Sequence, residues 1–291
     1  MPLYITETEQ WRTPTATNLS PLLLQSSAMQ IKFVEREEVQ NSNTYSRFIQ
    51  NIFEISNLHS SEQPYVFLPN TCPSLLFIIQ GDKAVGYVSA PLTKCKSVFV
   101  PANGRVLCIQ LKPGCLSWFT KRLPVLLTDQ IVPFQKCFAN AGTLLEQLSY
   151  IKNFHFQHEL IIEFLIKENV LEYQIDPIVQ QCIDFIHEKR GCCWVHEIAE
   201  TTARSERFLS KTFLAATGLT MKTYCEIIKF LNSFYWILKS RPRTISTIVK
   251  KYGYFDLPHM NRSYQKFTNY TVSYLQSISV DEICVPPLIP E

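Results

Sequence analysis

The sequence predicts an α+β protein: a mostly-β sandwich or barrel, then a helical linker, then an all-α domain. Short apolar runs separated by Pro, Gly and Asn fill residues 45–135, and after residue 144 the apolar residues recur at three and four positions. The last third then holds two similar helix–turn–helix patterns. A chain of 291 residues has room for two domains of ordinary size. We place them at residues 1–142 and 176–280, with the linker at residues 143–175.

The N-terminal domain is predicted to consist of short strands. Residues 1–45 read as irregular, because Thr13-Pro14 and Ser20-Pro21 are turn signals. After them come branched and aromatic runs that stop at turn residues: 65–68, 75–79, 98–100 and 106–111. Regularly spaced short runs of this kind are typical of a small β-sandwich or barrel.

The linker is predicted to form amphipathic helices, because its apolar residues share one helical face. These residues are Leu144, Leu145, Leu148, Ile151, Phe154, Leu160, Ile161, Phe164 and Leu165. The stripe from Leu145 to Leu165 either covers the β domain or pairs with its copy in a second subunit, and we expect a homodimer formed through residues 1–170. His155 and His158 lie one turn apart, which suits a metal ion. Their spacing offers no third ligand, so no metal site is predicted.

The ten cysteines are expected to be reduced thiols in the cytoplasm. The N-terminus lacks a basic start followed by an apolar core, so no secretory signal is predicted, and no apolar run reaches the roughly 18 residues of a membrane span. No pair forms Cys-x-x-Cys, which disfavours a thiolate metal site. Cys72 is a candidate redox sensor, but packing beside an apolar strand is the interpretation we prefer.

The first helix–turn–helix pattern begins at Asp176-Pro177, an N-cap and first helical residue. A helix to about residue 189 is followed by a second near residues 194–201, and Ser205 caps a third. The inward residues of this third helix are predicted to be Phe208, Leu209, Thr212 and Phe213. Its opposite face then carries Glu206, Arg207, Ser210 and Lys211.

The second pattern follows a long helix at residues 220–239, which we expect to be a rigid spacer that Pro242 interrupts. Gly253 supplies a tight turn and Asp256 caps the next helix. The residues of this helix predicted to face inward are Met260, Tyr264 and Phe267. The residues left available are His259, Asn261, Arg262 and Lys266.

Formal charge is distributed unevenly along the chain, whose net charge is +3. Residues 1–175 hold 14 Lys and Arg against 14 Asp and Glu, so this segment is neutral. Residues 176–280 hold 14 basic and 8 acidic side chains, an excess of six positive charges, and the last 11 residues carry three acidic ones. The positive charge therefore falls on the segment with the two repeated patterns, as contact with nucleic-acid phosphates would require.

Residues 176–278 resemble the AraC/XylS family of bacterial transcription activators. The match spans both units and is densest in the second, which reads Tyr252-Gly253-Tyr254 … Arg262 … Tyr264-Gln265-Lys266-Phe267-Thr268. The resemblance implies a sequence-specific DNA-binding transcription regulator, an activator by the family default, with double-stranded DNA and RNA polymerase as partners. It implies that Arg207, Ser210 and Lys211 of the first unit and His259, Asn261 and Arg262 of the second face the major groove.

Several positions depart from the family pattern. Val249 and Ser233 stand where Ala is usual, Asn269 replaces Gly, and Val272 and Leu275 replace Pro and Tyr. Asn tolerates the left-handed conformation that Gly supplies. These departures leave open an alternative, a degenerate helix–turn–helix protein that serves as a platform for protein interactions.

The N-terminal domain more faintly resembles a sensor-like domain that precedes some AraC-type regulators. Three stretches carry this resemblance: residues 67–72, 110–114 and 127–133. It implies the sensing of a small-molecule effector or a partner, and it names no ligand and no cofactor. An enzyme is not expected, because DNA-repair methyltransferases that carry an AraC-type domain need clustered zinc thiolates, and the cysteine spacings here do not offer them.

Overall fold

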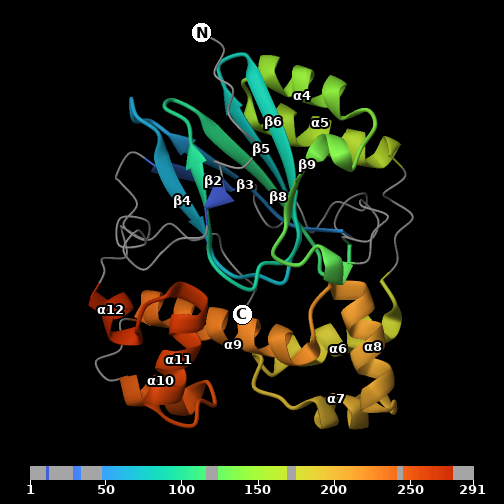
Figure 1. Ribbon diagram of the computed structural model, residues 1–291, viewed down its shortest axis with the longest axis vertical. Helices are drawn as coiled ribbons and strands as arrows, with labels where there is room; N and C mark the ends of the chain where they lie inside the picture. The colour runs from blue at the N-terminus through green and yellow to red at the C-terminus, as the bar shows by residue number, and fades with distance from the viewer. Residues whose placement is uncertain are drawn as a thin grey trace.

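The computed structural model describes residues 11–12, 29–33, 48–115, 124–168, 175–240 and 245–277. Within them, two antiparallel sheets and two flanking helices are followed by a helical C-terminal part. Figure 1 shows the sheets on one side of the long helix α9 and the remaining C-terminal helices gathered at its two ends. The predicted α+β class, with a β-rich part before an all-helical one, is confirmed.

The strands form a sandwich of unequal sheets. The smaller sheet has the order β1-β7-β4, with β1 at Trp11–Arg12, β4 at Gln63–Phe67 and β7 at Lys96–Val100. The larger sheet has the order β2-β3-β8-β5-β6-β9. Its strands are β2 (Met29–Phe33), β3 (Ile49–Asn57), β5 (Ser74–Gln80), β6 (Lys83–Ser89), β8 (Arg105–Leu111) and β9 (Ile131–Pro133). Because β1 and β2 fall within residues 1–45, the prediction that this whole segment is irregular was wrong.

The larger sheet buries apolar side chains on both faces. One face meets the smaller sheet, where Phe53, Leu76 and Cys108 pack against Tyr65 and Val98. The other face meets α4 (Ala141–Tyr150) and α5 (Phe154–Lys167). Figure 1 shows these two helices lying along the sheet beside β6.

The apolar stripe of the linker helices covers the sheet. Leu148 and Leu165 are fully buried in the cluster that includes Phe77 and Leu107 of the sheet. This is the first of the two alternatives that the stripe allowed. The homodimer stays a prediction, and a dimer would have to use a different surface.

The C-terminal helices are capped where the sequence predicts. They are α6 (Pro177–Glu188), α7 (Val195–Thr202), α8 (Glu206–Thr217), α9 (Met221–Ser240), α10 (Ile245–Lys251), α11 (Leu257–Thr268) and α12 (Val272–Ser277). The side chains of Asp176, Ser205 and Asp256 each accept a hydrogen bond from a backbone amide in the first turn of α6, α8 and α11. Asn269 ends α11 in the left-handed conformation, with φ of 63°. In the described part of the chain, no helix combines the length and the apolarity that crossing a bilayer demands.

Candidate nucleic-acid interface

The first helix–turn–helix unit consists of α7 and α8 packed on α6 and on the start of α9. Ile198 of α7 and Leu209 and Phe213 of α8 are buried in one cluster with Tyr224 of α9. The Tyr224 hydroxyl lies 3.1 Å from Nε2 of His187 on α6. Burial lowers the pKa of His187 to about 4, so this ring is neutral near pH 7. The unit is thus held by an apolar core, and the contact of Tyr224 with His187 adds a polar link between α9 and α6.

The outer face of α8 presents the side chains that the sequence predicts. All four are exposed: Glu206, Arg207, Ser210 and Lys211. Arg207 and Lys211 are one turn apart, and within the described residues neither makes an ion pair. Both cations are therefore available to an external anion.

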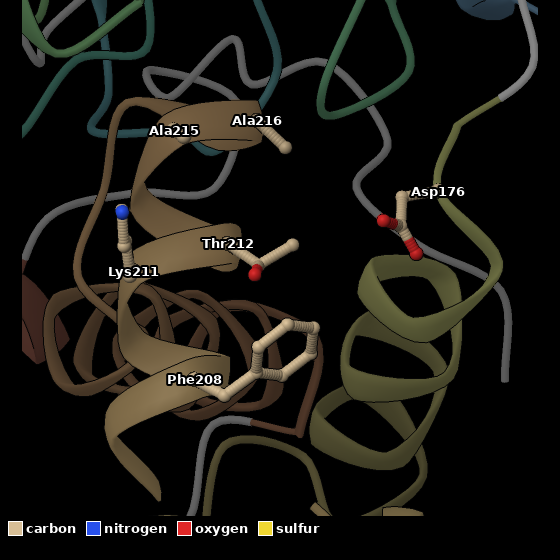
Figure 2. A pocket seen from close by; sticks show the side chains of 6 residues that line it. All are labelled: Asp176, Phe208, Lys211, Thr212, Ala215 and Ala216. Carbon is tan, nitrogen blue, oxygen red and sulfur yellow. The ribbon is translucent and has the colours of Figure 1, made fainter. Parts of the chain in front are cut away.

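One flank of α8 is less covered than predicted. Phe208 was expected to face inward, but 44% of its surface is exposed, and Thr212 is only half-buried. Figure 2 shows both side chains projecting from α8 toward α6, at whose start Asp176 lies. Apolar recurrence marks the helix stripe that faces the core, but it does not say how far the neighbouring helix extends over that stripe.

This flank forms an open hollow between α8 and α6. Its lining is Asp176, Phe208, Lys211, Thr212, Ala215 and Ala216. Asp176 already accepts the amide of Ile178 as a helix cap, at 2.8 Å. The hollow therefore offers an apolar wall with few polar groups, and it holds no nucleophile paired with a base.

The second unit is held to α9 by a buried hydroxyl network. Ser233 donates to the carbonyl of Phe230 at 2.9 Å, and its Oγ lies 2.7 Å from the Tyr264 hydroxyl and 3.2 Å from that of Tyr254. Burial raises the pKa of Tyr254 to about 12 and raises that of Tyr264 well above its usual value, so both phenols stay protonated donors. The departure from Ala at position 233 thus supplies a polar centre that joins α9, the turn before α11 and α11 itself.

The residues of α11 that were predicted to contact DNA differ in their exposure and in their contacts within the fold. His259, Arg262 and Lys266 are exposed, whereas Asn261 is half-buried and its Oδ1 accepts the amide of Val272 at 3.1 Å. Asn261 therefore also caps α12.

Two of the exposed side chains of α11 have partners within the fold. Nδ1 of His259 accepts the amide of Phe255 at 3.2 Å, and Lys266 lies 2.6 Å from the Glu226 carboxylate of α9. Arg262 has no ion-pair partner among the described residues. Arg262 is consequently the most accessible cation of the predicted set on this helix.

The β-rich part contacts the C-terminal end of α8. A short 3-10 helix, η1 (Pro124–Leu126), lies against Gly218, and the hydroxyl of Thr128 donates to the Gly218 carbonyl at 2.7 Å. Gly218 has φ of +78°, and a Cβ there would lie 2.9 Å from the Pro124 carbonyl. The contact is therefore backbone against backbone, which only glycine permits.

A second contact reaches α9 and the second unit. The hydroxyl of buried Tyr224 lies near the side chain of Thr71, and burial raises the pKa of Tyr224 well above its usual value. The amide of Cys95 lies 3.4 Å from the carbonyl of Phe267 at the end of α11. Two of the three stretches of the sensor-like resemblance, residues 67–72 and 127–133, thus lie at the junction with the helices. Sequence reasoning did not identify this junction, because its partners are separated by 90 or more positions.

The thiols and histidines noted in the sequence acquire definite surroundings. Cys72 is buried, and burial raises its pKa to about 12, so the packing interpretation fits and thiolate chemistry does not.

The side chain of Glu159 stands beside those of His155 and His158, and one potential ligand atom from each of the three residues lies within 4.8 Å of the others. This set could hold a divalent cation, so the expectation that no third ligand stands near the two histidines was wrong.

Comparison with known proteins assigns no family. No protein-family model matches the chain, and no curated protein matches it in sequence. The fold is similar to that of ToxT from Vibrio cholerae O395, with a TM-score of 0.44 and 12% identity over 86% of this chain and 98% of that chain. It is also similar to wild-type ToxT from strain SCE256 with a bound unsaturated fatty acid, with a TM-score of 0.42 and 11% identity over 86% and 96% of the two chains. At this level of likeness, neither a function nor a ligand passes from those structures to this chain.

Proposed function

We propose that this chain is a sequence-specific DNA-binding regulator of transcription. The observation that carries the proposal is the pair of helix–turn–helix units on one long helix, each with at least one exposed cation on its second helix that makes no ion pair among the described residues. In such a unit the second helix enters the major groove. Two units on a rigid spacer would read two groove segments, with centres about 34 Å apart if both lie on one face of the duplex.

The exposed residues of α8 are proposed to read bases. The planar fork of Arg207 suits bidentate contact with guanine, and it stands on the same face as Lys211. Ser210 and Glu206 flank them, and both types of side chain can hydrogen-bond to base edges. Arg207 is the residue to which we assign most of the base preference of the first unit.

The second unit is proposed to contribute more to positioning. Arg262 is assigned to a DNA phosphate, because it is exposed and makes no ion pair with any residue that the structure describes. His259 and Asn261 stand near the start and middle of α11 and are proposed to face the groove. Lys266 joins the interface if DNA draws it away from Glu226, an exchange of one exposed ion pair for another.

The β-rich part is proposed to sense an effector or a partner and to pass the signal through the junction. The contact of Thr128 with Gly218 ends on α8 of the first unit, and the contact of Cys95 with Phe267 ends on α11 of the second unit. A shift of the β-rich part would therefore move the two units relative to each other. Activation through RNA polymerase is the form of regulation that we propose.

The decisive experiment is selection of bound sequences from random double-stranded DNA by the full-length protein. We expect an enriched motif, and we expect affinity for it to fall steeply with salt, because cationic side chains displace counterions. Arg207→Ala should cost about 1–3 kcal/mol and relax preference at one base position, whereas Arg262→Ala should weaken all sequences alike. Lys83→Ala, which removes an exposed cation from β6, is the matched control and should change neither property.

The same experiment tests the alternative of a protein-interaction platform. That alternative draws on the aromatic side chains that the first unit exposes, Trp194 at 73% and Phe208 at 44%. If no motif is enriched and binding does not depend on Arg207, the DNA proposal fails. If Trp194→Ala leaves DNA binding intact, the exposed rings are free to contact a protein such as RNA polymerase.

A further inference from the structure

We propose that Cys193 and Cys225 form a peroxide-responsive disulfide site in the first helical unit. Their sulfur atoms lie 3.8 Å apart, although the residues are 32 positions apart in the chain. Cys193 lies in the segment that leads into α7, and Cys225 lies in α9. The proposal concerns the chemistry of these two thiols and does not depend on DNA binding.

A close backbone approach brings the two thiols together. Gly191, with φ of +75°, starts the segment before α7, and a Cβ there would clash with the carbonyl oxygen of Cys225 and lie 2.5 Å from the amide nitrogen of Lys229. The segment therefore runs directly over the backbone of α9. Because Cys193 follows two residues later, its side chain falls beside that of Cys225.

The geometry requires only a small movement to make a bond. A disulfide has an S–S distance of about 2.05 Å, so the two sulfurs have to close by about 1.8 Å. Cys225 is buried in a regular helix, whereas Cys193 is half-buried and lies outside any helix or strand. Rotation of the Cys193 side chain can supply the movement while α9 stays in place.

The two thiols have complementary reactivity. Either sulfur can donate in this contact; when Cys193 is the thiolate, the Cys225 thiol donates to it and lowers the pKa of Cys193. The charge of Lys189 acts in the same direction, against burial and the carboxylate of Glu197. The pKa of Cys225 is raised by the same contact and by burial, so it stays protonated. Cys193 is therefore the attacking thiolate and Cys225 the resolving thiol.

The reaction with hydrogen peroxide balances without another reactant. The Cys193 thiolate attacks one peroxide oxygen, so that an S–O bond forms, the O–O bond breaks, and the departing hydroxide takes a proton to become water. The Cys225 sulfur then attacks the sulfenic sulfur, so that the S–S bond forms, the S–O bond breaks, and the hydroxyl leaves with the Cys225 proton as a second water. Two thiols are oxidised, and one peroxide is reduced to two waters.

The neighbouring Cys192 serves as the matched control. It is more exposed than Cys193, but its thiol donates to the carbonyl of Tyr252 at 3.2 Å, and burial raises its pKa. It is thus directed toward the second unit rather than toward Cys225. If exposure alone decided which thiol forms the disulfide, Cys192 would react. If the distance to the Cys225 sulfur decides it, Cys193 reacts.

The test treats the reduced full-length protein with hydrogen peroxide, blocks the remaining thiols in denaturant and maps tryptic peptides by mass spectrometry. Cleavage after Lys and Arg places Cys192 and Cys193 in residues 191–204 and Cys225 in residues 223–229. We expect these two peptides to become cross-linked, with the loss of two of the ten thiols and recovery on treatment with dithiothreitol. Cys192→Ser should keep the cross-link, and Cys193→Ser and Cys225→Ala should each abolish it.

Specific outcomes would overturn the proposal. One is a cross-link that survives Cys193→Ser, because Cys192 would then be the reactive thiol. Another is sulfenic acid at Cys193 without any cross-link to Cys225, and a third is a cross-link formed only between two chains. Cys193→Ser alters a half-buried position and should leave the circular dichroism spectrum unchanged, so the result stands even if Cys225→Ala disturbs the core.

Discussion

Gly218→Ala tests the junction between the β-rich part and the end of α8. The substitution has two costs that can be worked from the structure. Alanine in the left-handed conformation at φ of +78° costs about 1–2 kcal/mol relative to glycine. The new Cβ would also lie 2.9 Å from the carbonyl carbon and oxygen of Pro124 and 3.1 Å from Oγ1 of Thr128.

Relief of this clash requires α8 and η1 to separate, because backbone atoms on the Pro124 side cannot rotate away. Separation removes the hydrogen bond from Thr128 to Gly218, which adds about 0.5–1.5 kcal/mol. We therefore expect a total cost of about 1.5–3.5 kcal/mol. Gly81→Ala is the matched control, since Gly81 has φ of +60° and a Cβ there meets nothing within 4 Å. It should carry the conformational cost alone.

Hydrogen exchange of the full-length protein distinguishes the two variants. The amides of Leu127 and Gln130 are bonded to the carbonyls of Pro124 and Leu127 at 3.0 and 2.7 Å. Gly218→Ala should speed exchange at both amides, and Gly81→Ala should leave them unchanged. Equal exchange at these amides in the two variants, together with equal loss of stability, would refute the argument that the junction is closed against Gly218.

Three further predictions concern the helical part. Ser233→Ala leaves the buried Tyr264 hydroxyl without its partner, so urea unfolding should show a loss of about 1–3 kcal/mol; an unchanged midpoint would contradict the network. The folded-state pKa of His187 is about 4, against an ordinary value of 6.5, so between these values only the unfolded chain binds the proton. Stability should therefore decline by about 1.4 kcal/mol per pH unit as the pH falls from 6.5 toward 4. His187→Gln should flatten this decline and the exposed control His196→Gln should not; equal slopes would count against the buried neutral ring. Asn261→Ala should cost about 0.5–2 kcal/mol in thermal unfolding by uncapping α12; weaker DNA binding at unchanged stability would show instead that Asn261 acts in the groove.

The sequence alone determined the features that depend on neighbours in the chain. Asp176, Ser205 and Asp256 were identifiable as helix caps, because a cap needs only a short polar side chain and the amides two or three residues after it. The left-handed Asn269 was expected for the same local reason. The exposed faces of α8 and α11 followed from the positions of their apolar residues, although the flank at Phe208 did not.

Strands were predictable only where burial left an unbroken apolar run. β3 was missed because Glu54 and Asn57 interrupt its run, yet both are buried. Glu54 pairs with Arg105 of β8 at 3.2 Å, and Asn57 donates to the carbonyl of Val100 at 3.0 Å. No local pattern reports such partners, because they come from other strands.

Tertiary structure alone decided the contacts between distant residues. It placed the linker stripe on the sheet, paired Lys266 with Glu226, set Thr128 against Gly218 and brought Cys193 to Cys225. Each of these contacts joins residues that are distant in the chain, and the sequence around one partner does not identify the other. The physical reason is that propensity and periodicity define which face of an element is buried, whereas the packing of whole elements chooses which residues meet across it.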